Sequence, residues 1–92
     1  MYQSFNLKSM PYAQARVRIE KGKIVLQSYA TDVCIVDEEG WLEVTGLYSM
    51  TTRRHIGAFC KDYFPTVDFH TCKSIYLANQ KINVHTGEVL PL

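Results

Sequence analysis

The chain has 92 residues, enough for one compact domain (residues 1–92) but not for two. Hydrophobic residues make up 47% of it and charged residues 21%, ordinary globular values that argue against a disordered chain. The formal net charge of +1 argues against a strongly basic nucleic-acid binder, although a local basic patch would be compatible with it.

The chain begins with residues 1–11, which we expect to form an irregular arm, because Pro11 removes a backbone donor and disfavours regular structure just before it. From Tyr12 to Glu20 apolar and polar residues alternate, which is typical of a half-buried strand. The apolar face carries Ala13, Ala15, Val17 and Ile19. The polar face carries Gln14, Arg16, Arg18 and Glu20.

Three further strands are predicted, and short polar turns precede the first and the last of them. They span residues 23–29, 31–37 and 41–45, and the turns contain Lys21-Gly22 and the acidic run Asp37-Glu38-Glu39-Gly40. Short turns between successive strands predict a four-stranded antiparallel meander.

The spacing of apolar residues then changes to three and four, which predicts an amphipathic helix from Met50 to Asp62. Ser49 is placed to cap it, and Pro65 ends it. Ile56 and Phe59 are expected to anchor this helix to the sheet. The fold class is therefore α+β, a meander packed against one helix.

The remaining chain is ambiguous. Residues 66–80 fit either a short helix or a strand, and we favour a second helix. Residues 81–84 and 88–90 flank His85-Thr86-Gly87, which indicates a small final hairpin.

No apolar run approaches the roughly 18 residues that a membrane-spanning helix requires, and the first residues lack the apolar segment of a signal peptide. We therefore expect a cytoplasmic protein without membrane association. Cys34, Cys60 and Cys72 are odd in number and have apolar neighbours, which favours buried, reduced thiols.

The densest polar cluster lies where the predicted helix begins. A helix N-terminus offers unpaired amides and the positive end of a dipole, so hydroxyls and arginines beside it would complete a site for phosphate or carboxylate. The alternative is a hydroxyl-capped helix with solvated arginines and a structural histidine. The candidate binding residues are Tyr48, Ser49, Thr51, Thr52, Arg53, Arg54 and His55.

Other chemistry has little support in the sequence. Residues of ligand type occur at His55, Cys60, His70 and Cys72, but no C-x-x-C or H-x-x-x-H pair is present. There is no phosphate-binding or dinucleotide-binding glycine motif, and no catalytic signature surrounds the thiols. We therefore predict no metal, no cofactor, no disulfide and no enzymatic activity.

Aromatic residues are a second lead to a binding surface, because a core this small does not readily hold all of them. The alternative is that the meander uses them for packing. The residues concerned are Tyr2, Phe5, Tyr12, Tyr29, Trp41, Tyr48 and Phe64.

Residues 29–63 resemble small uncharacterised proteins of phages, plasmids and other mobile elements of Firmicutes. The shared pattern is Gly-x-Tyr-Ser-x-Thr-Thr-x-x-His-Ile-x-x-Phe, which runs here from Gly46 to Phe59. The resemblance implies no known activity, and it does not extend beyond Pro65.

The setting implied by this resemblance suggests a function by analogy. Small mobile-element proteins without catalytic motifs often bind host machinery, as anti-CRISPR inhibitors do. We expect a non-enzymatic protein that occludes a host protein through its sheet face or through the Tyr48–His55 segment. The alternative is a nucleic-acid-binding or nucleotide-binding module that uses the same segment. Self-association is compatible with either.

Overall fold

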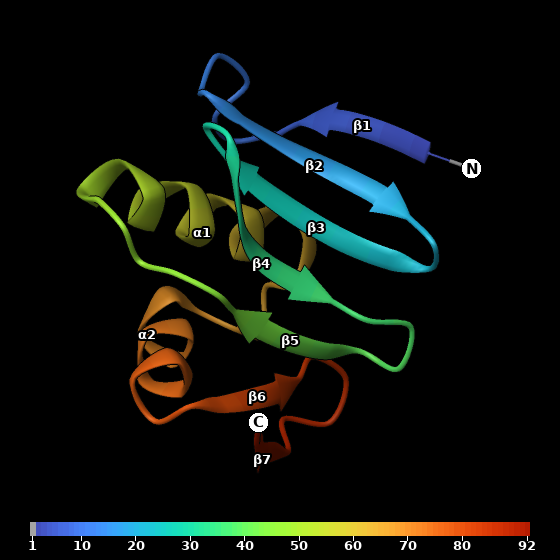
Figure 1. Cartoon of the computed structure of the whole chain (residues 1–92), viewed down its shortest axis with the longest axis vertical. Coiled ribbons are helices and arrows are strands. Elements are labelled where there is room, and N and C mark those ends of the chain that lie inside the picture. Colours follow the sequence, from blue (N-terminus) through green and yellow to red (C-terminus); the bar gives the residue numbers. More distant parts are fainter. Residues whose placement is uncertain (1) are drawn as a thin grey trace.

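The computed structural model describes residues 2–92, with the side chain of Tyr2 outside the description. Seven strands form one antiparallel sheet in which the order of the strands follows the chain (Figure 1). The strands are β1 (Tyr2–Asn6), β2 (Ala15–Glu20), β3 (Lys23–Ser28), β4 (Thr31–Val36), β5 (Trp41–Val44), β6 (Gln80–Asn83) and β7 (Val89–Pro91).

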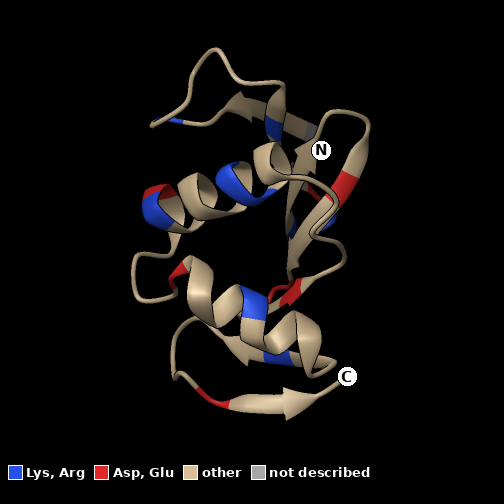
Figure 2. Ribbon diagram, turned by 90° about the vertical axis from the view of Figure 1, so that its left-hand side faces the viewer, with Lys and Arg blue, Asp and Glu red and all other residues tan. Residues whose placement is uncertain are grey.

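Two helices, α1 (Met50–Tyr63) and α2 (Phe69–Leu77), are inserted between β5 and β6. Both cover the same face of the sheet, so the molecule has two layers (Figures 1 and 2). α1 packs on β3 and β4, and α2 packs on β5 and β6. The core lies between the layers, and its fully buried members include Leu26, Cys34, Leu42, Ile56, Phe59 and Cys72.

The α+β class, the helix from Met50 and the small C-terminal hairpin are confirmed. The second helix is also present, because the Asp68 carboxylate accepts a hydrogen bond from the Thr71 amide at 2.8 Å and caps it. α1 ends at Tyr63 with Phe64 as its C-cap, just before Pro65, as the proline predicts.

The irregular arm predicted for residues 1–11 is wrong for residues 2–6, which form β1 and pair with β2, whereas residues 7–11 have no regular structure, and residue 1 lies outside the described residues. Pro11 lies in the loop that follows this strand, where its missing donor costs no ladder bond. The prediction of a four-stranded meander therefore understates the sheet. β1 extends the predicted strands on one side, and β6 and β7 extend them on the other. None of the helices in the described residues is long and apolar enough to span a membrane.

The predicted alternation in β2 is confirmed at Val17, which is 1% exposed, and at Arg16, which faces solvent. Ile19 lies on the same helix-covered face, as predicted, but it is 36% exposed rather than buried. Arg18 lies on the opposite face and forms ion pairs with Asp32 and Glu20.

Candidate functional site

The N-terminus of α1 is held against the end of β3 by a buried group of polar side chains. Ser28, Thr52 and His55 are each at most 3% exposed. The Ser28 hydroxyl lies 2.8 Å from His55 Nδ1 and 3.1 Å from the Thr52 hydroxyl. Because all three are satisfied by one another, the group fixes the helix to the sheet without an unpaired buried atom among the described residues.

These hydroxyls connect the helix N-cap to the buried histidine. Ser49, the N-cap, accepts a hydrogen bond from the Thr52 amide at 3.1 Å and donates its own hydroxyl to Thr52 at 3.2 Å. The Thr52 hydroxyl in turn shares a hydrogen bond with Ser28, and the Ser28 hydroxyl shares one with His55 Nδ1.

Burial lowers the pKa of His55, in agreement with a neutral ring. The Tyr29 ring lies against it, with a centroid distance of 5.8 Å. A serine bonded to a histidine resembles a nucleophile–base pair. Here, however, both groups are buried, and the serine is engaged by Thr52, so we assign the pair a structural role.

Above this network lies an exposed surface, which we call the α1 corner and define as Tyr29, Tyr48, Met50, Arg53 and Arg54. Tyr29 comes from the β3–β4 turn and Tyr48 from the β5–α1 loop, so the two rings come from the turns on either side of the helix N-terminus. Tyr29 is 54% exposed, and Tyr48 and Met50 are each 66% exposed. Such exposure is high for large apolar side chains.

The position of Tyr48 depends on Gly46. A Cβ atom at Gly46 would lie 2.2 Å from the Tyr48 ring, so the ring folds over a backbone that only glycine leaves clear. The Tyr48 hydroxyl donates to the Thr45 carbonyl at 3.4 Å. The spacing Gly-x-Tyr therefore builds part of the α1 corner.

The α1 corner is basic. The first turn of α1 contains no acidic residue, and neither Arg53 nor Arg54 forms an ion pair among residues 2–92. Figure 2 shows basic positions and no acidic ones along the first half of α1. The positive end of the helix dipole adds to this field.

The structure divides the residues predicted for this site into two groups. Ser49, Thr52 and His55 belong to the cap and the buried network, whereas Tyr48 and Arg54 are exposed, and Thr51 and Arg53 are half-buried. Tyr29 and Met50 are site residues that the cluster did not include. Tyr29 is distant from this cluster in the sequence. Its only signal was that the chain has more aromatic residues than a core of this size readily holds.

Only some of the aromatic residues singled out in the sequence are exposed. Tyr12 is 98% exposed on the β1–β2 loop, and Phe5 is 42% exposed on β1. Trp41 and Phe64 are half-buried, so for them the packing alternative holds. The side chain of Tyr2 lies outside the described residues.

The cap and the arginines give a first prediction. Ser49→Ala should lower the free energy of unfolding by about 1 kcal/mol, because the Thr52 amide loses its partner. Arg53→Ala and Arg54→Ala should change it by less than about 0.5 kcal/mol, since exposed charges contribute little to folding. Urea unfolding of the three variants measures both values. A large loss in either arginine variant would assign that residue a structural role.

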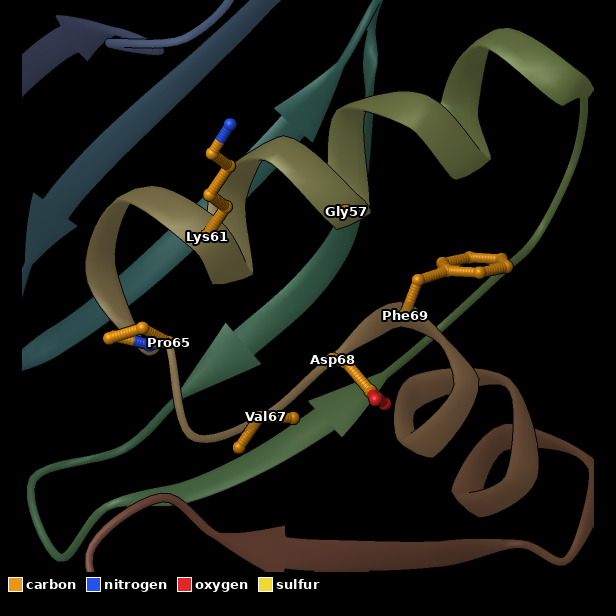
Figure 3. A pocket seen from close by; sticks show the side chains of 6 residues that line it. All are labelled: Gly57, Lys61, Pro65, Val67, Asp68 and Phe69. Atoms are coloured by element: carbon orange, nitrogen blue, oxygen red, sulfur yellow. The ribbon is translucent and has the colours of Figure 1, made fainter.

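A hollow of about 240 Å³ lies between the two helices (Figure 3). Its lining is Gly57, Lys61, Pro65, Val67, Asp68 and Phe69. The lining is mostly apolar, and its one carboxylate, on Asp68, already caps α2. We therefore place the candidate site at the α1 corner.

The three cysteines are free and buried, as expected. Cys60 and Cys72 join α1 to α2, with their sulfur atoms 3.5 Å apart. The hydrogen bond with Cys60 and burial both raise the pKa of Cys72, and burial raises that of Cys34, which keeps these thiols protonated and unreactive. Within residues 2–92 no three potential metal ligands lie together.

Comparison with known proteins gives one match. The model of a family of unknown function, DUF8033, matches residues 3–75, from β1 into α2. No curated protein and no solved structure matches the chain.

Proposed function

The chain belongs to DUF8033, a family of unknown function, and from the α1 corner we propose that it is a non-enzymatic binding protein that occludes a protein partner. In the mobile-element setting that the resemblance suggests, the partner is a component of a host defence system, and the chain acts in the cytoplasm of the host bacterium. The observation that carries the proposal is the exposure of Tyr48 and Met50 beside free arginines.

The composition of this surface supports protein binding. Tyr, Met and Arg are enriched where proteins meet, and a few such side chains carry most of the binding energy. The buried network beneath them fixes the backbone of the α1 corner, so little conformational entropy is lost on binding. Arg53 and Arg54 would steer an acidic partner and make association salt-dependent.

A nucleic-acid partner is the second candidate, because the same surface combines exposed tyrosines with two arginines. Bases stack on aromatic rings, and arginines bind phosphates. The net charge of +1 disfavours it, since affinity for nucleic acid rests mainly on an excess of basic residues.

The test compares two double variants of matched exposure. Tyr48→Ala/Met50→Ala removes side chains that are 66% exposed at the α1 corner. The control, Leu77→Ala/Leu92→Ala, removes side chains that are 67% and 62% exposed, at the end of α2 and after β7. Both variants and the unmodified chain are used as bait in a bacterial lysate, with and without nuclease.

We expect the unmodified chain and the control to retain the same protein after nuclease treatment, and the corner variant to lose it. Recovery of nucleic acid that disappears with nuclease would support the second candidate. Equal retention by the corner variant and the control would contradict both, because both require the α1 corner.

A further prediction separates the charge from the aromatic surface. Arg53→Ala/Arg54→Ala should weaken partner binding about tenfold at low salt, and the loss should shrink as ionic strength rises. Titration calorimetry with the captured partner at two salt concentrations measures this. An unchanged affinity at low salt would remove the arginines from the binding surface.

A further inference from the structure

The outer edge of the sheet is formed by β1, which pairs with β2 on one side only (Figure 1). An edge strand presents backbone N–H and C=O groups to which another strand can bind. Natural proteins usually block such an edge with charges, proline, a bulge or a very short strand. The two edges of this sheet differ in that respect.

At the far edge, β7 has three residues and ends in Pro91. β1 has five residues, Tyr-Gln-Ser-Phe-Asn, without a charge or a proline. Its pairing with β2 is continuous from Tyr2 to Asn6 and contains no bulge. The edge at β1 is therefore open, whereas the edge at β7 is blocked.

The residues of β1 whose backbone groups point outward follow from the neighbouring hairpin. β2 and β3 are joined by the two-residue turn Lys21-Gly22, with both φ angles positive, so the flanking Glu20–Lys23 pair exchanges backbone hydrogen bonds. The Tyr29 amide donates to the Gln14 carbonyl, which continues the same alternation.

Every second residue of β2, from Gln14 to Glu20, thus bonds to β3, and the residues between them bond to β1. Val17 and Ile19 face Phe5 and Gln3, which use their backbone groups on β2. The backbone groups of Ser4 and Asn6 consequently point away from the sheet.

We propose that β1 binds β1 of a second copy of the chain, antiparallel and around a two-fold axis at Ser4. Ser4 then faces Ser4 of the other copy, and residues 2 and 6 face each other. The pairing forms about six backbone hydrogen bonds. A symmetric pair brings identical residues together, and none of the residues of β1 is charged.

The exposed apolar residues of this edge fit the same partner. Phe5 is 42% exposed and Ile19 is 36% exposed, and both lie on the helix-covered face at the end of the sheet. In the two-fold register Phe5 faces Gln3 of the second copy and reaches the second Phe5 diagonally. The second copy therefore covers apolar surface that the helices leave open.

The test uses two substitutions at Ser4. Ser4→Pro removes the outward amide and leaves the ladder to β2 intact. Ser4→Ala keeps the amide. Both lose the hydrogen bond that the Ser4 hydroxyl accepts from Arg16 at 3.0 Å, so the amide is the difference between them. Sedimentation velocity over about a hundredfold range of concentration measures the mass of each, since a contact of this size gives a weak dimer.

We expect the unmodified chain and Ser4→Ala to reach twice the chain mass of 10.6 kDa, and Ser4→Pro to stay at the single mass. Hydrogen exchange gives a second measurement: the amides of Ser4 and Asn6 should become protected only as concentration rises, and those of Gln3 and Phe5 at all concentrations. A chain that is monomeric throughout, or a Ser4→Pro dimer equal to the unmodified one, would overturn the proposal.

Discussion

Phe59→Ala is expected to lower the free energy of unfolding by about 3–5 kcal/mol, the largest effect of any single change discussed for this chain. The ring is fully buried, and it packs on Tyr63 and Phe64 with centroid distances of 5.6 Å to each. Removing it leaves a cavity between α1 and the sheet that the surrounding strands cannot close. Urea unfolding followed by circular dichroism measures the loss.

The matched control is Leu77→Ala on α2, where the side chain is 67% exposed. It removes a large apolar group without opening a cavity, so its effect should be within about 0.5 kcal/mol. If Phe59→Ala costs less than about 1 kcal/mol, the helix is held to the sheet by other contacts, and the assignment of Phe59 as an anchor is wrong.

The sequence predicted those parts of the fold whose signals are local. The stripe of apolar residues at spacings of three and four located α1 to within one residue, and the short polar turns located the strands from β2 to β5. β1 was missed because Gln3, Ser4 and Asn6 give no apolar alternation. Its place in the sheet depends on pairing with β2, and the residues of β1 carry no local signal that predicts this pairing.

The candidate site was predicted in part for the same reason. The pattern from Gly46 to Phe59 is explained by the structure almost position by position: Gly46 admits the Tyr48 ring, Ser49 caps the helix, and Ile56 and Phe59 enter the core. The contribution of Ser28 and Tyr29 could not be predicted, because they lie more than twenty residues before the helix residues that they contact and meet them only after folding.

Two features that look like chemistry in isolation are thus structural in this fold. The cysteines sit between layers, and the serine–histidine pair lies beneath the α1 corner rather than in a cleft. Met50 and Arg54 stand at positions that the pattern leaves unspecified and remain exposed together with Tyr48, and Arg53, at another such position, is half-buried. The residues of the pattern hold the backbone of the α1 corner in place, and these side chains form the surface that a partner would contact.

The second large effect is expected from pH, through His55. In the unfolded chain its pKa is about 6.5, and burial lowers it in the folded chain. Between these two values the unfolded state binds more protons, so stability rises with pH across this window. The part of the stability that depends on a neutral His55 is fully present above about pH 6.5. Below that value the free energy of unfolding falls by up to about 1.4 kcal/mol per pH unit.

The control is His55→Asn, in which this dependence should flatten between about pH 5 and 7. Asp32 and Asp68 do not contribute in this range, because hydrogen bonds from Arg18 lower the pKa of Asp32, and hydrogen bonds from Thr71 lower that of Asp68. His70 and His85 are exposed and remain in both proteins. A slope that persists in His55→Asn would mean that a group other than His55 titrates on unfolding.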